Sequence, residues 1–316
     1  MSAKQIAFLF PGQGSQKLGM GADLAKAFPI AKATFEEANQ ILGLSISQLA
    51  WEGPEDELND TANTQPALMV HSVAALRLLT DQFPQLNPSA VAGHSMGELS
   101  ALVAAGALPF ADALRLVRTR GELMKQAGQD SPGGMAAILG LGIPDVENLC
   151  ASSSSEDEVV QVANDNCPGQ VVISGHRAAV DRAVANAKEA GAKRALPLAV
   201  SIAAHSPLML SIETEFMAAV EAAPITDPRI PIVGNVQAST LQSAQAIRED
   251  LNAQLNARVR WTESVQAMLA MGIDTFIEIG SGSVLLNLVK RIDRASTRIA
   301  LGNPEDFNQA AELLAA

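Results

Sequence analysis

The chain has little of what several functional classes require. Two cysteines, Cys150 and Cys167, are too few for a disulfide framework or a cysteine metal cluster. There is no long basic run, and a formal net charge of −12 argues against a nucleic-acid binder, which must neutralise phosphates. No apolar stretch reaches the ~18 residues of a membrane span. The short apolar run at residues 6–10 leads directly into Pro11, so it predicts a first strand and not a signal peptide.

What is present is a composition that can form a large core. The 316 residues suffice for one large or two modest domains, and 48% are hydrophobic against 18% charged. That balance predicts a sizeable core and excludes global disorder. The low cysteine count fits a reducing, cytoplasmic compartment, and we expect Cys167 to be a buried, unreactive thiol.

A nucleophile elbow is the strongest single pattern in the chain. Gly93-His94-Ser95-Met96-Gly97 matches G-x-S-x-G, in which a serine occupies a sharp turn between a strand and a helix. Residues 88–92 predict the end of a buried strand, and residues 98–106 are rich in helix formers. Such a turn exposes the Ser95 Oγ at the carboxyl end of the strand. It also leaves the Met96 backbone N–H free to bind a developing oxyanion.

A glycine loop follows the first predicted strand. Residues 11–16, Pro-Gly-Gln-Gly-Ser-Gln, fail the dinucleotide pattern G-x-G-x-x-G because Lys17 holds the third glycine position, and no G-x-x-x-x-G-K-[ST] occurs. In nucleophile-elbow enzymes, the second oxyanion N–H comes from a loop after an early strand. We therefore predict that Gln13 supplies it.

The order of the predicted elements indicates an α/β fold. Strands alternate with helices in residues 1–130 and 199–316, which predicts a mostly parallel sheet. Residues 131–198 instead follow the ferredoxin-like order βαββαβ. The prediction is a hydrolase-like catalytic domain, 1–130 and 199–316, with a ferredoxin-like small domain, 131–198, inserted into it.

Ser95 needs a general base, and the chain has four histidines. His94 is adjacent to the serine around a sharp turn and would point away from it, and His71 lies among apolar residues of a predicted helix. His176 stands at a helix start. His205 lies in a loop and follows the serine in chain order, as in hydrolase-fold triads, which makes it the favoured candidate without excluding the others. No aspartate can be assigned as a third member, and a backbone carbonyl would orient the imidazole equally well.

Seven motifs follow one another along the chain: Phe10-Pro-Gly-Gln-Gly-Ser-Gln16, Thr64-Gln-Pro-Ala67, Gly93-His-Ser-Met-Gly-Glu98, Val117-Arg-Thr-Arg-Gly121, Pro168-Gly-Gln-Val-Val-Ile-Ser-Gly175, His205-Ser-Pro-Leu-Met209 and Glu278-Ile-Gly-Ser-Gly282. Together they resemble the malonyl-coenzyme A:acyl carrier protein transacylase family of type II fatty-acid synthesis. The resemblance covers nearly all of the chain, and several independent motifs in one order make it specific. The family's fold agrees with the two domains predicted above.

The resemblance implies an activity and a set of site residues. The expected enzyme moves malonyl from malonyl-coenzyme A to the phosphopantetheine thiol of acyl carrier protein through a malonyl-Ser95 intermediate, with no bound cofactor or metal. The implied residues are Ser95 as nucleophile, His205 as base, Gln13 and Met96 as oxyanion donors, Arg120 for the malonyl carboxylate, Asn164 lining the site, and Gln254, whose backbone carbonyl would orient His205.

Two features depart from the family pattern. Met96 stands where leucine is commoner, a swap of similar volume that keeps the backbone N–H. Residues 202–205, Ile-Ala-Ala-His, differ from the signatures of malonyl or methylmalonyl selection in modular synthases, which leaves fine selectivity and pathway, fatty acid or polyketide, open.

Two other functions compete with acyl transfer. A serine acyl hydrolase or esterase would share the elbow, but it has no use for a buried Arg120 guanidinium facing the acyl group. A catalytically silent carrier-binding subunit would not need Ser95, His205 and Arg120 intact.

The carrier protein is typically acidic, as this chain is, so docking requires a local basic patch. Lys290, Arg291 and Arg294 form the predicted patch, although they would also complement the dipole at the end of their helix. We expect a monomer with no nucleic-acid or membrane partner.

Overall fold

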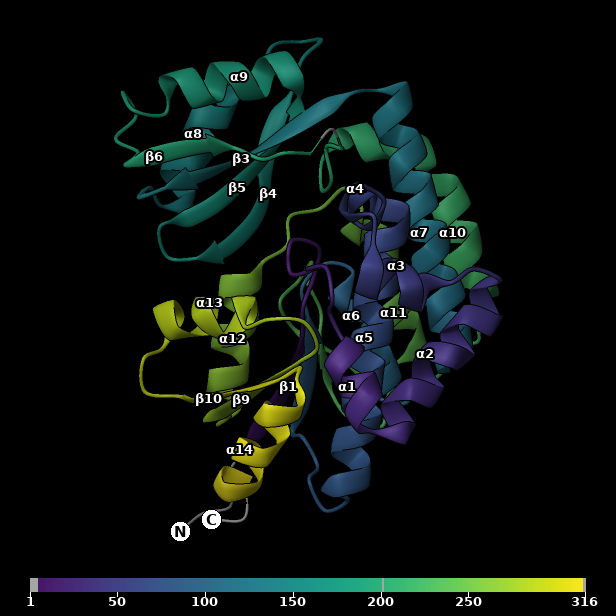
Figure 1. Cartoon of the computed structure of the whole chain (residues 1–316). Coiled ribbons are helices and arrows are strands. Elements are labelled where there is room, and N and C mark those ends of the chain that lie inside the picture. Colours follow the sequence, from purple (N-terminus) through teal and green to yellow (C-terminus); the bar gives the residue numbers. More distant parts are fainter. Residues whose placement is uncertain (1–4, 201, 315–316) are drawn as a thin grey trace.

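The computed structural model describes residues 5–200 and 202–314, which form two sheets flanked by helices (Figure 1). Residues 1–4, 201 and 315–316 of the predicted catalytic domain lie outside the described residues. The larger sheet has six strands in the spatial order β10 (Thr297–Leu301), β9 (Thr275–Ile279), β1 (Ile6–Phe10), β2 (Ala90–Gly93), β7 (Ile232–Val233) and β8 (Thr240–Leu241). All neighbours are parallel except β7 and β8. The fold is thus α/β, with a mostly parallel sheet.

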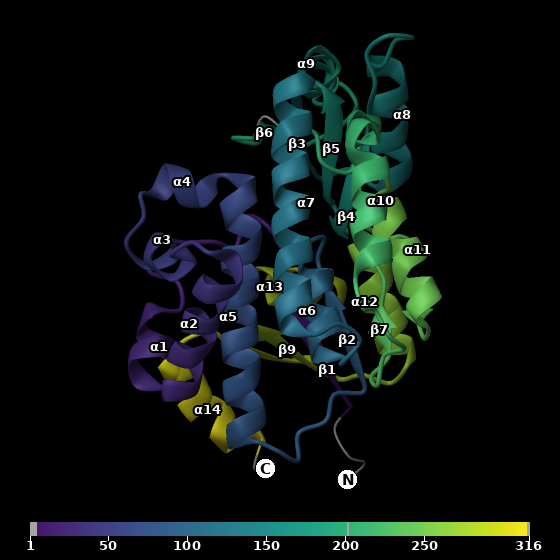
Figure 2. The same cartoon turned by 90° about the vertical axis from the view of Figure 1, so that its right-hand side faces the viewer.

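Helices cover both faces of the larger sheet (Figures 1 and 2). The chain's apolar strands explain this, because a strand such as β1 is buried along its whole length and needs cover on both sides. Ile6, Phe8 and Phe10 join one hydrophobic cluster, whereas Ala7 and Leu9 join another on the opposite face. Among the described residues, the α-helices and the 3-10 helix η1 of this part are α1 (Ala22–Ala27), α2 (Pro29–Leu42), α3 (Ile46–Glu52), α4 (Glu55–Asn59), α5 (Thr61–Gln82), α6 (Gly97–Ala104), α7 (Phe110–Asp130), η1 (Pro207–Ile212), α10 (Glu213–Ala222), α11 (Ala244–Gln254), α12 (Trp261–Ala270), α13 (Val284–Ile292) and α14 (Pro304–Leu314).

The smaller sheet is antiparallel and lies between α7 and η1 in the chain. Its segment runs β3 (Gly133–Leu139), α8 (Ile143–Ser153), β4 (Val160–Cys167), β5 (Gln170–His176), α9 (Arg177–Asn186) and β6 (Arg194–Pro197), and the spatial strand order is β4-β5-β3-β6. Residues of α8 and α9 share one hydrophobic cluster with the strands, so both helices cover the same face. Figure 2 shows α7 running along the larger unit up to the start of this sheet.

Strand β4 joins the small sheet to the large unit. Val259, just before α12, bonds to it on both sides: its N–H donates to the Ala163 carbonyl at 2.8 Å, and its carbonyl accepts the Asp165 N–H at 2.9 Å. Gln161, also on β4, donates its Nε2 to the carbonyls of His205 and Asn256, each at 2.9 Å. A strand of the small sheet is therefore bonded directly to backbone that surrounds His205.

Local contacts explain the bounds of two elements of the large unit. Helix α5 begins at Thr61, because Asp60 caps it by accepting the Ala62 N–H at 3.0 Å, and it continues through Pro66. Strand β7 is only Ile232–Val233. Pro231 has no N–H for a ladder, and the chain then turns so that Asn235 faces the serine turn.

Candidate active site

Ser95 occupies the sharp turn between β2 and α6. Its φ of 52° lies in the left-handed region, which a serine keeps only when its surroundings hold it there. The flanking glycines are required by space, since a Cβ on Gly93 would collide with the Gly97 backbone and one on Gly97 would collide with the Phe10 carbonyl. The strand, turn and helix predicted around Ser95 are all present.

His205 is the histidine that contacts Ser95. Its Nε2 is 2.8 Å from the Ser95 Oγ, and its Nδ1 is 2.8 Å from the Gln254 backbone carbonyl. Because a carbonyl only accepts, Nδ1 carries the proton and the Nε2 lone pair faces the hydroxyl. Burial, followed by the charge of Arg120, lowers the pKa of His205 to about 3. The imidazole is therefore neutral at neutral pH and free to take the hydroxyl proton.

The other three histidines contact other parts of the chain. His94 Nε2 lies 2.9 Å from the Asn166 Oδ1, and His71 Nε2 lies 2.9 Å from the Gly302 carbonyl. His176 is the residue before α9. Of the four candidates that the sequence offered, the geometry singles out His205.

Arg120 brings a buried positive charge to the serine. Its side chain projects from α7 and is 2% exposed. Nη2 donates to the Ser95 Oγ at 3.1 Å and to the Gln254 Oε1 at 3.0 Å, while Nη1 donates to the Gln65 Oε1 at 2.8 Å. Burial lowers the pKa of Arg120 to about 10, so it stays charged at neutral pH. Within residues 5–200 and 202–314 no carboxylate forms a salt bridge with it, so an anionic substrate group beside the serine would find a partner here.

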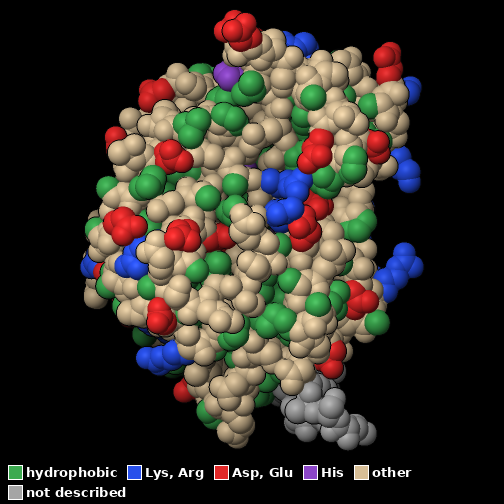
Figure 3. All heavy atoms as spheres, turned by 180° about the vertical axis from the view of Figure 1, so that it is seen from behind, with side chains coloured by type: hydrophobic (Ala, Val, Ile, Leu, Met, Phe, Trp, Pro, Cys, Tyr) green, Lys and Arg blue, Asp and Glu red, His purple; other side chains and the backbone are tan. Residues whose placement is uncertain are grey.

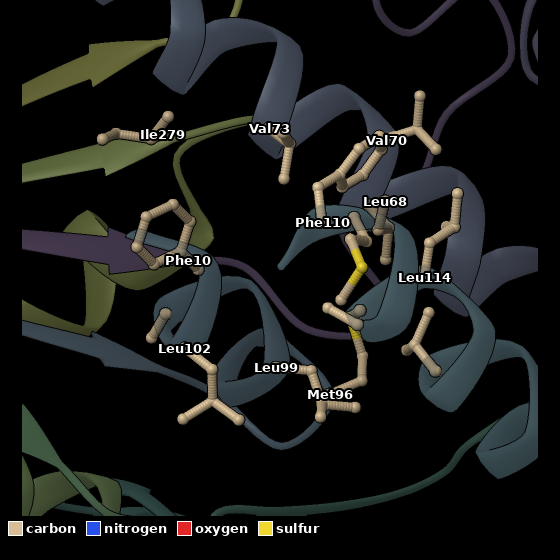
Figure 4. Close-up of a cluster of buried hydrophobic side chains, with 14 of the residues drawn as sticks. Phe10, Leu68, Val70, Val73, Met96, Leu99, Leu102, Phe110, Leu114 and Ile279 are labelled. Carbon is tan, nitrogen blue, oxygen red and sulfur yellow. The ribbon is translucent and has the colours of Figure 1, made fainter. Parts of the chain in front are cut away.

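Gln13 and Met96 leave their backbone N–H groups available. Among the described residues neither N–H donates to another protein group. The glycine loop lies against the elbow, since a Cβ on Gly12 would collide with the His94 carbonyl. The Gln13 Oε1 accepts from the Thr61 hydroxyl at 2.8 Å, whereas the Met96 side chain points into the hydrophobic cluster next to Leu99 (Figure 4). Met96 therefore presents only its backbone to the site.

A buried polar network supports these residues, and sequence reasoning missed most of it. Asn235, Glu98 and Asp250 lie beneath the elbow and are at most 5% exposed. Gln254 joins them, because its Nε2 donates to the Glu98 Oε2 at 3.0 Å and to the Ser95 carbonyl at 3.3 Å. The acidic residue that ends the motif at residues 93–98 is a feature by which the sequence could have indicated Glu98 as part of the site. Nothing local marked Asn235, which comes from a segment 140 residues after the serine.

Asn164 is a predicted site residue whose side chain is not hydrogen-bonded to the catalytic residues in the described part of the chain. It is 6% exposed on β4, where its backbone forms a bridge with Val259. No hydrogen bond of the described residues joins its side chain to Ser95, His205 or Arg120.

The predicted docking residues lie at and after the end of α13. Lys290 and Arg294 are exposed. Arg291 has a structural contact as well, since it donates to the Gln170 Oε1 at 2.7 Å and to the Pro168 carbonyl at 3.1 Å in the turn between β4 and β5. Figure 3 shows that basic side chains gather only in small groups on the face opposite to that of Figure 1.

Neither a metal nor a membrane site was found in the part of the chain that the structure describes. Its histidines, cysteines and carboxylates form no group of three or more that could hold a metal ion. None of its helices combines the length and the apolar character that a membrane span requires.

Comparisons with known proteins agree over nearly the whole chain. The family model described as acyl transferase domain matches residues 7–302. The chain is 46% identical over 311 residues to the malonyl CoA-acyl carrier protein transacylase of Haemophilus influenzae and 47% identical over 311 residues to that of Escherichia coli strain K12, covering 98% of this chain and 99% of the relative in both cases.

Two solved structures are also similar to this chain over nearly its whole length. A type II PKS acyl-carrier protein in complex with its malonyl-transacylase contains a chain of 44% identity and TM-score 0.95, which covers 98% of this chain and 100% of its own length. An acyl carrier protein S-malonyltransferase from Vibrio cholerae has 42% identity and TM-score 0.93, with 97% of this chain and 100% of that one covered.

Proposed function

The chain belongs to the acyl transferase domain family and, within it, to the malonyl CoA-acyl carrier protein transacylases, and from this premise we propose the reaction of its site. It transfers the malonyl group from malonyl-coenzyme A to acyl carrier protein, as an [acyl-carrier-protein] S-malonyltransferase. The observation that carries the catalytic assignment is the 2.8 Å contact between the Ser95 hydroxyl and a neutral, carbonyl-oriented His205.

The first half of the reaction makes an acyl-enzyme. The Ser95 oxygen attacks the thioester carbonyl as His205 Nε2 takes its proton. The oxyanion that develops is bound by the backbone N–H groups of Gln13 and Met96. When the tetrahedral intermediate collapses, the carbon–sulfur bond breaks and His205 returns the proton to the leaving thiolate, which departs as coenzyme A.

The second half repeats these steps with a different thiol. The phosphopantetheine thiol of the carrier protein gives its proton to His205 and attacks the malonyl ester. Collapse then breaks the bond to Ser95, which recovers its proton. One thioester is exchanged for another without an added cofactor, so the reaction is close to thermoneutral. Because a covalent acyl-enzyme separates the two halves, the kinetics are ping-pong.

Arg120 selects a dicarboxylic acyl group. Its guanidinium is buried, charged and 3.1 Å from the Ser95 Oγ, so a carboxylate two bonds beyond the reacting carbonyl can pair with it. Asn164, on β4, lines the acyl pocket in this proposal. A serine esterase would share Ser95 and His205, but a buried guanidinium beside its nucleophile would have no anionic partner, which favours malonyl transfer over the hydrolase alternative.

The domain assignment belongs to the same proposal. We take residues 1–130 and 199–316 as a hydrolase-like catalytic domain and residues 131–198 as an inserted ferredoxin-like domain. The element order of the insertion, with both helices on one face of an antiparallel sheet, supports this. The enzyme acts as a cytoplasmic monomer with no resident cofactor. Its two buried, free cysteines fit a reducing compartment.

Intact-mass spectrometry tests the proposal directly. Mixing the protein with malonyl-coenzyme A should add one malonyl group to the parent chain and none to Ser95→Ala. Adding holo acyl carrier protein should then remove the adduct and place it on the carrier. An adduct that persists on Ser95→Ala, or one that is released only as free malonate, would refute the assignment.

A further inference from the structure

Asn235 holds both sides of the nucleophile turn. Its Oδ1 accepts the Ser95 backbone N–H at 2.7 Å, and its Nδ2 donates to the Gly93 carbonyl at 2.7 Å. The side chain is 1% exposed, so water does not share these contacts. A carboxamide is the one side-chain group of this size that offers an acceptor and a donor in fixed positions on one plane.

These two contacts bear on the strained residue of the turn. Ser95 is held at a φ of 52°, a conformation that is strained for a non-glycine residue. The Ser95 N–H and the Gly93 carbonyl lie on either side of His94, so a group bonded to both fixes the path of the backbone through the turn. The direction of the Ser95 side chain, and hence its contact with His205, depends on that path.

The orientation of Asn235 is itself fixed from below. Nδ2 also donates to the Glu98 Oε2, and the Asn235 backbone N–H donates to the Glu98 Oε2 at 3.1 Å and to the Asp250 Oδ2 at 3.3 Å. Because the Gly93 carbonyl can only accept and the Ser95 N–H can only donate, the amide has one allowed orientation, with Oδ1 toward Ser95.

Glu98 connects this clamp to the rest of the site. The same oxygen accepts from the Gln254 Nε2, whose residue holds His205 by its backbone and Arg120 by its side-chain oxygen. Glu98 and Asp250 are two buried carboxyl groups in contact, and burial together with the Asp250 charge raises the pKa of Glu98 well above its usual value. The raised pKa favours the protonated form of Glu98, which accepts hydrogen bonds through Oε2 without bringing a charge to the clamp.

We propose that Asn235 is the positioning residue of the nucleophile, clamping the elbow through Ser95 N–H and Gly93 C=O, and that the Glu98 Oε2 orients it by accepting from its side-chain and backbone N–H groups. This inference rests on the proposed function, because it is the malonylation of Ser95 that the clamp serves. It assigns roles to two residues that neither touch the acyl group nor take part in proton transfer.

The experiment measures the single-turnover rate of malonyl-Ser95 formation over a range of malonyl-coenzyme A concentrations. In Asn235→Ala the maximal rate should fall on the order of 10²-fold, as expected for a misplaced reacting atom. The half-saturating concentration should change by less than about threefold, because substrate binding groups are untouched. Asn235→Asp keeps the shape but loses the donor to Gly93, so it should be slow as well, and it serves if the alanine variant folds poorly.

Asn252→Ala is the matched control. Asn252 lies on α11 between Asp250 and Gln254 in sequence, and in the described part of the chain its Oδ1 has no hydrogen-bond partner. It should keep the parent rate. Glu98→Gln should stay within about threefold of the parent because glutamine keeps the acceptor oxygen, whereas Glu98→Leu should be as slow as Asn235→Ala.

The outcomes separate this inference from the function on which it rests. A parent chain that is not malonylated would refute the proposed function. A malonylated parent with equally fast Asn235→Ala and Asn235→Asp variants would overturn the clamp alone. A slow Glu98→Gln would show that Glu98 acts by its charge and would overturn its neutral role.

Discussion

Replacing Arg120 with alanine should separate malonyl transfer from acetyl transfer. The Arg120 guanidinium makes three hydrogen bonds, to Gln65, Gln254 and Ser95, and lies within reach of a carboxylate on the acyl group. Acetyl-coenzyme A has the same thioester and uses the same Ser95 and His205 but brings no carboxylate. The two substrates therefore differ in one contact.

The size of the effect follows from burial. Removing one partner of a buried, hydrogen-bonded charge pair costs about 2–5 kcal/mol, because the other charge is left without a partner. At 1.4 kcal/mol per tenfold, this is a loss of about 30-fold to a few thousand-fold in kcat/KM for malonyl-coenzyme A. Any disturbance of Gln254 affects both substrates equally, whereas only malonyl-coenzyme A loses the contact of its carboxylate. The kcat/KM for acetyl-coenzyme A should therefore fall much less, or rise.

The assay follows malonyl and acetyl transfer to holo acyl carrier protein with the same enzyme preparations. Arg118→Ala is the control, since Arg118 lies on the same helix but binds Asn63 and Glu122. It should leave both reactions near the parent rates. Equal losses for malonyl and acetyl transfer in Arg120→Ala would mean that Arg120 only supports the structure, and the selection argument would fail.

Three further predictions concern pH and docking. The pH dependence of kcat/KM reports the pKa values of the free enzyme, and the pKa of His205 is lowered to about 3. The kcat/KM for malonyl transfer should therefore stay constant down to about pH 5, and a fall in kcat/KM near pH 6.5 would contradict the neutral imidazole. Burial raises the pKa of Glu278 to about 7, so the folded state keeps a proton that the unfolded chain has lost; stability should fall as pH rises from about 4.5 to about 7, and urea midpoints of Glu278→Gln should not show this part of the fall. Reversing Lys290 and Arg294 to glutamate should raise KM for the carrier protein at low salt and leave KM for malonyl-coenzyme A nearly unchanged; an unaltered carrier-protein KM would remove this patch from the docking surface.

The sequence predicted what is encoded locally. The apolar run of residues 6–10 and the G-x-S-x-G turn each lie within a few consecutive residues, and both are found where they were expected. Four histidines could be ranked, but only the fold shows that residue 205 lies against residue 95. Family resemblance, and not spacing, pointed to Gln254.

The network beneath the elbow could not be predicted. Asn235 lies just beyond the end of β7, and its two contacts with the turn arise only from tertiary packing. Glu98 ends the motif at residues 93–98, but the motif does not show that its side chain is fully buried and lies against Asp250. Buried polar groups form hydrogen bonds with residues far away in sequence, and a local sequence pattern does not indicate which residues these are.

Gln161 connects the small sheet to the backbone of the catalytic base. Its amide fixes the backbone of the base from the small sheet, while the position of the nucleophile is fixed from the large one. The distance between Ser95 and His205 therefore depends on contacts from both sheets, although both residues belong to the large unit. Substitutions far from the substrate, along β4, can alter the rate by shifting the backbone of His205.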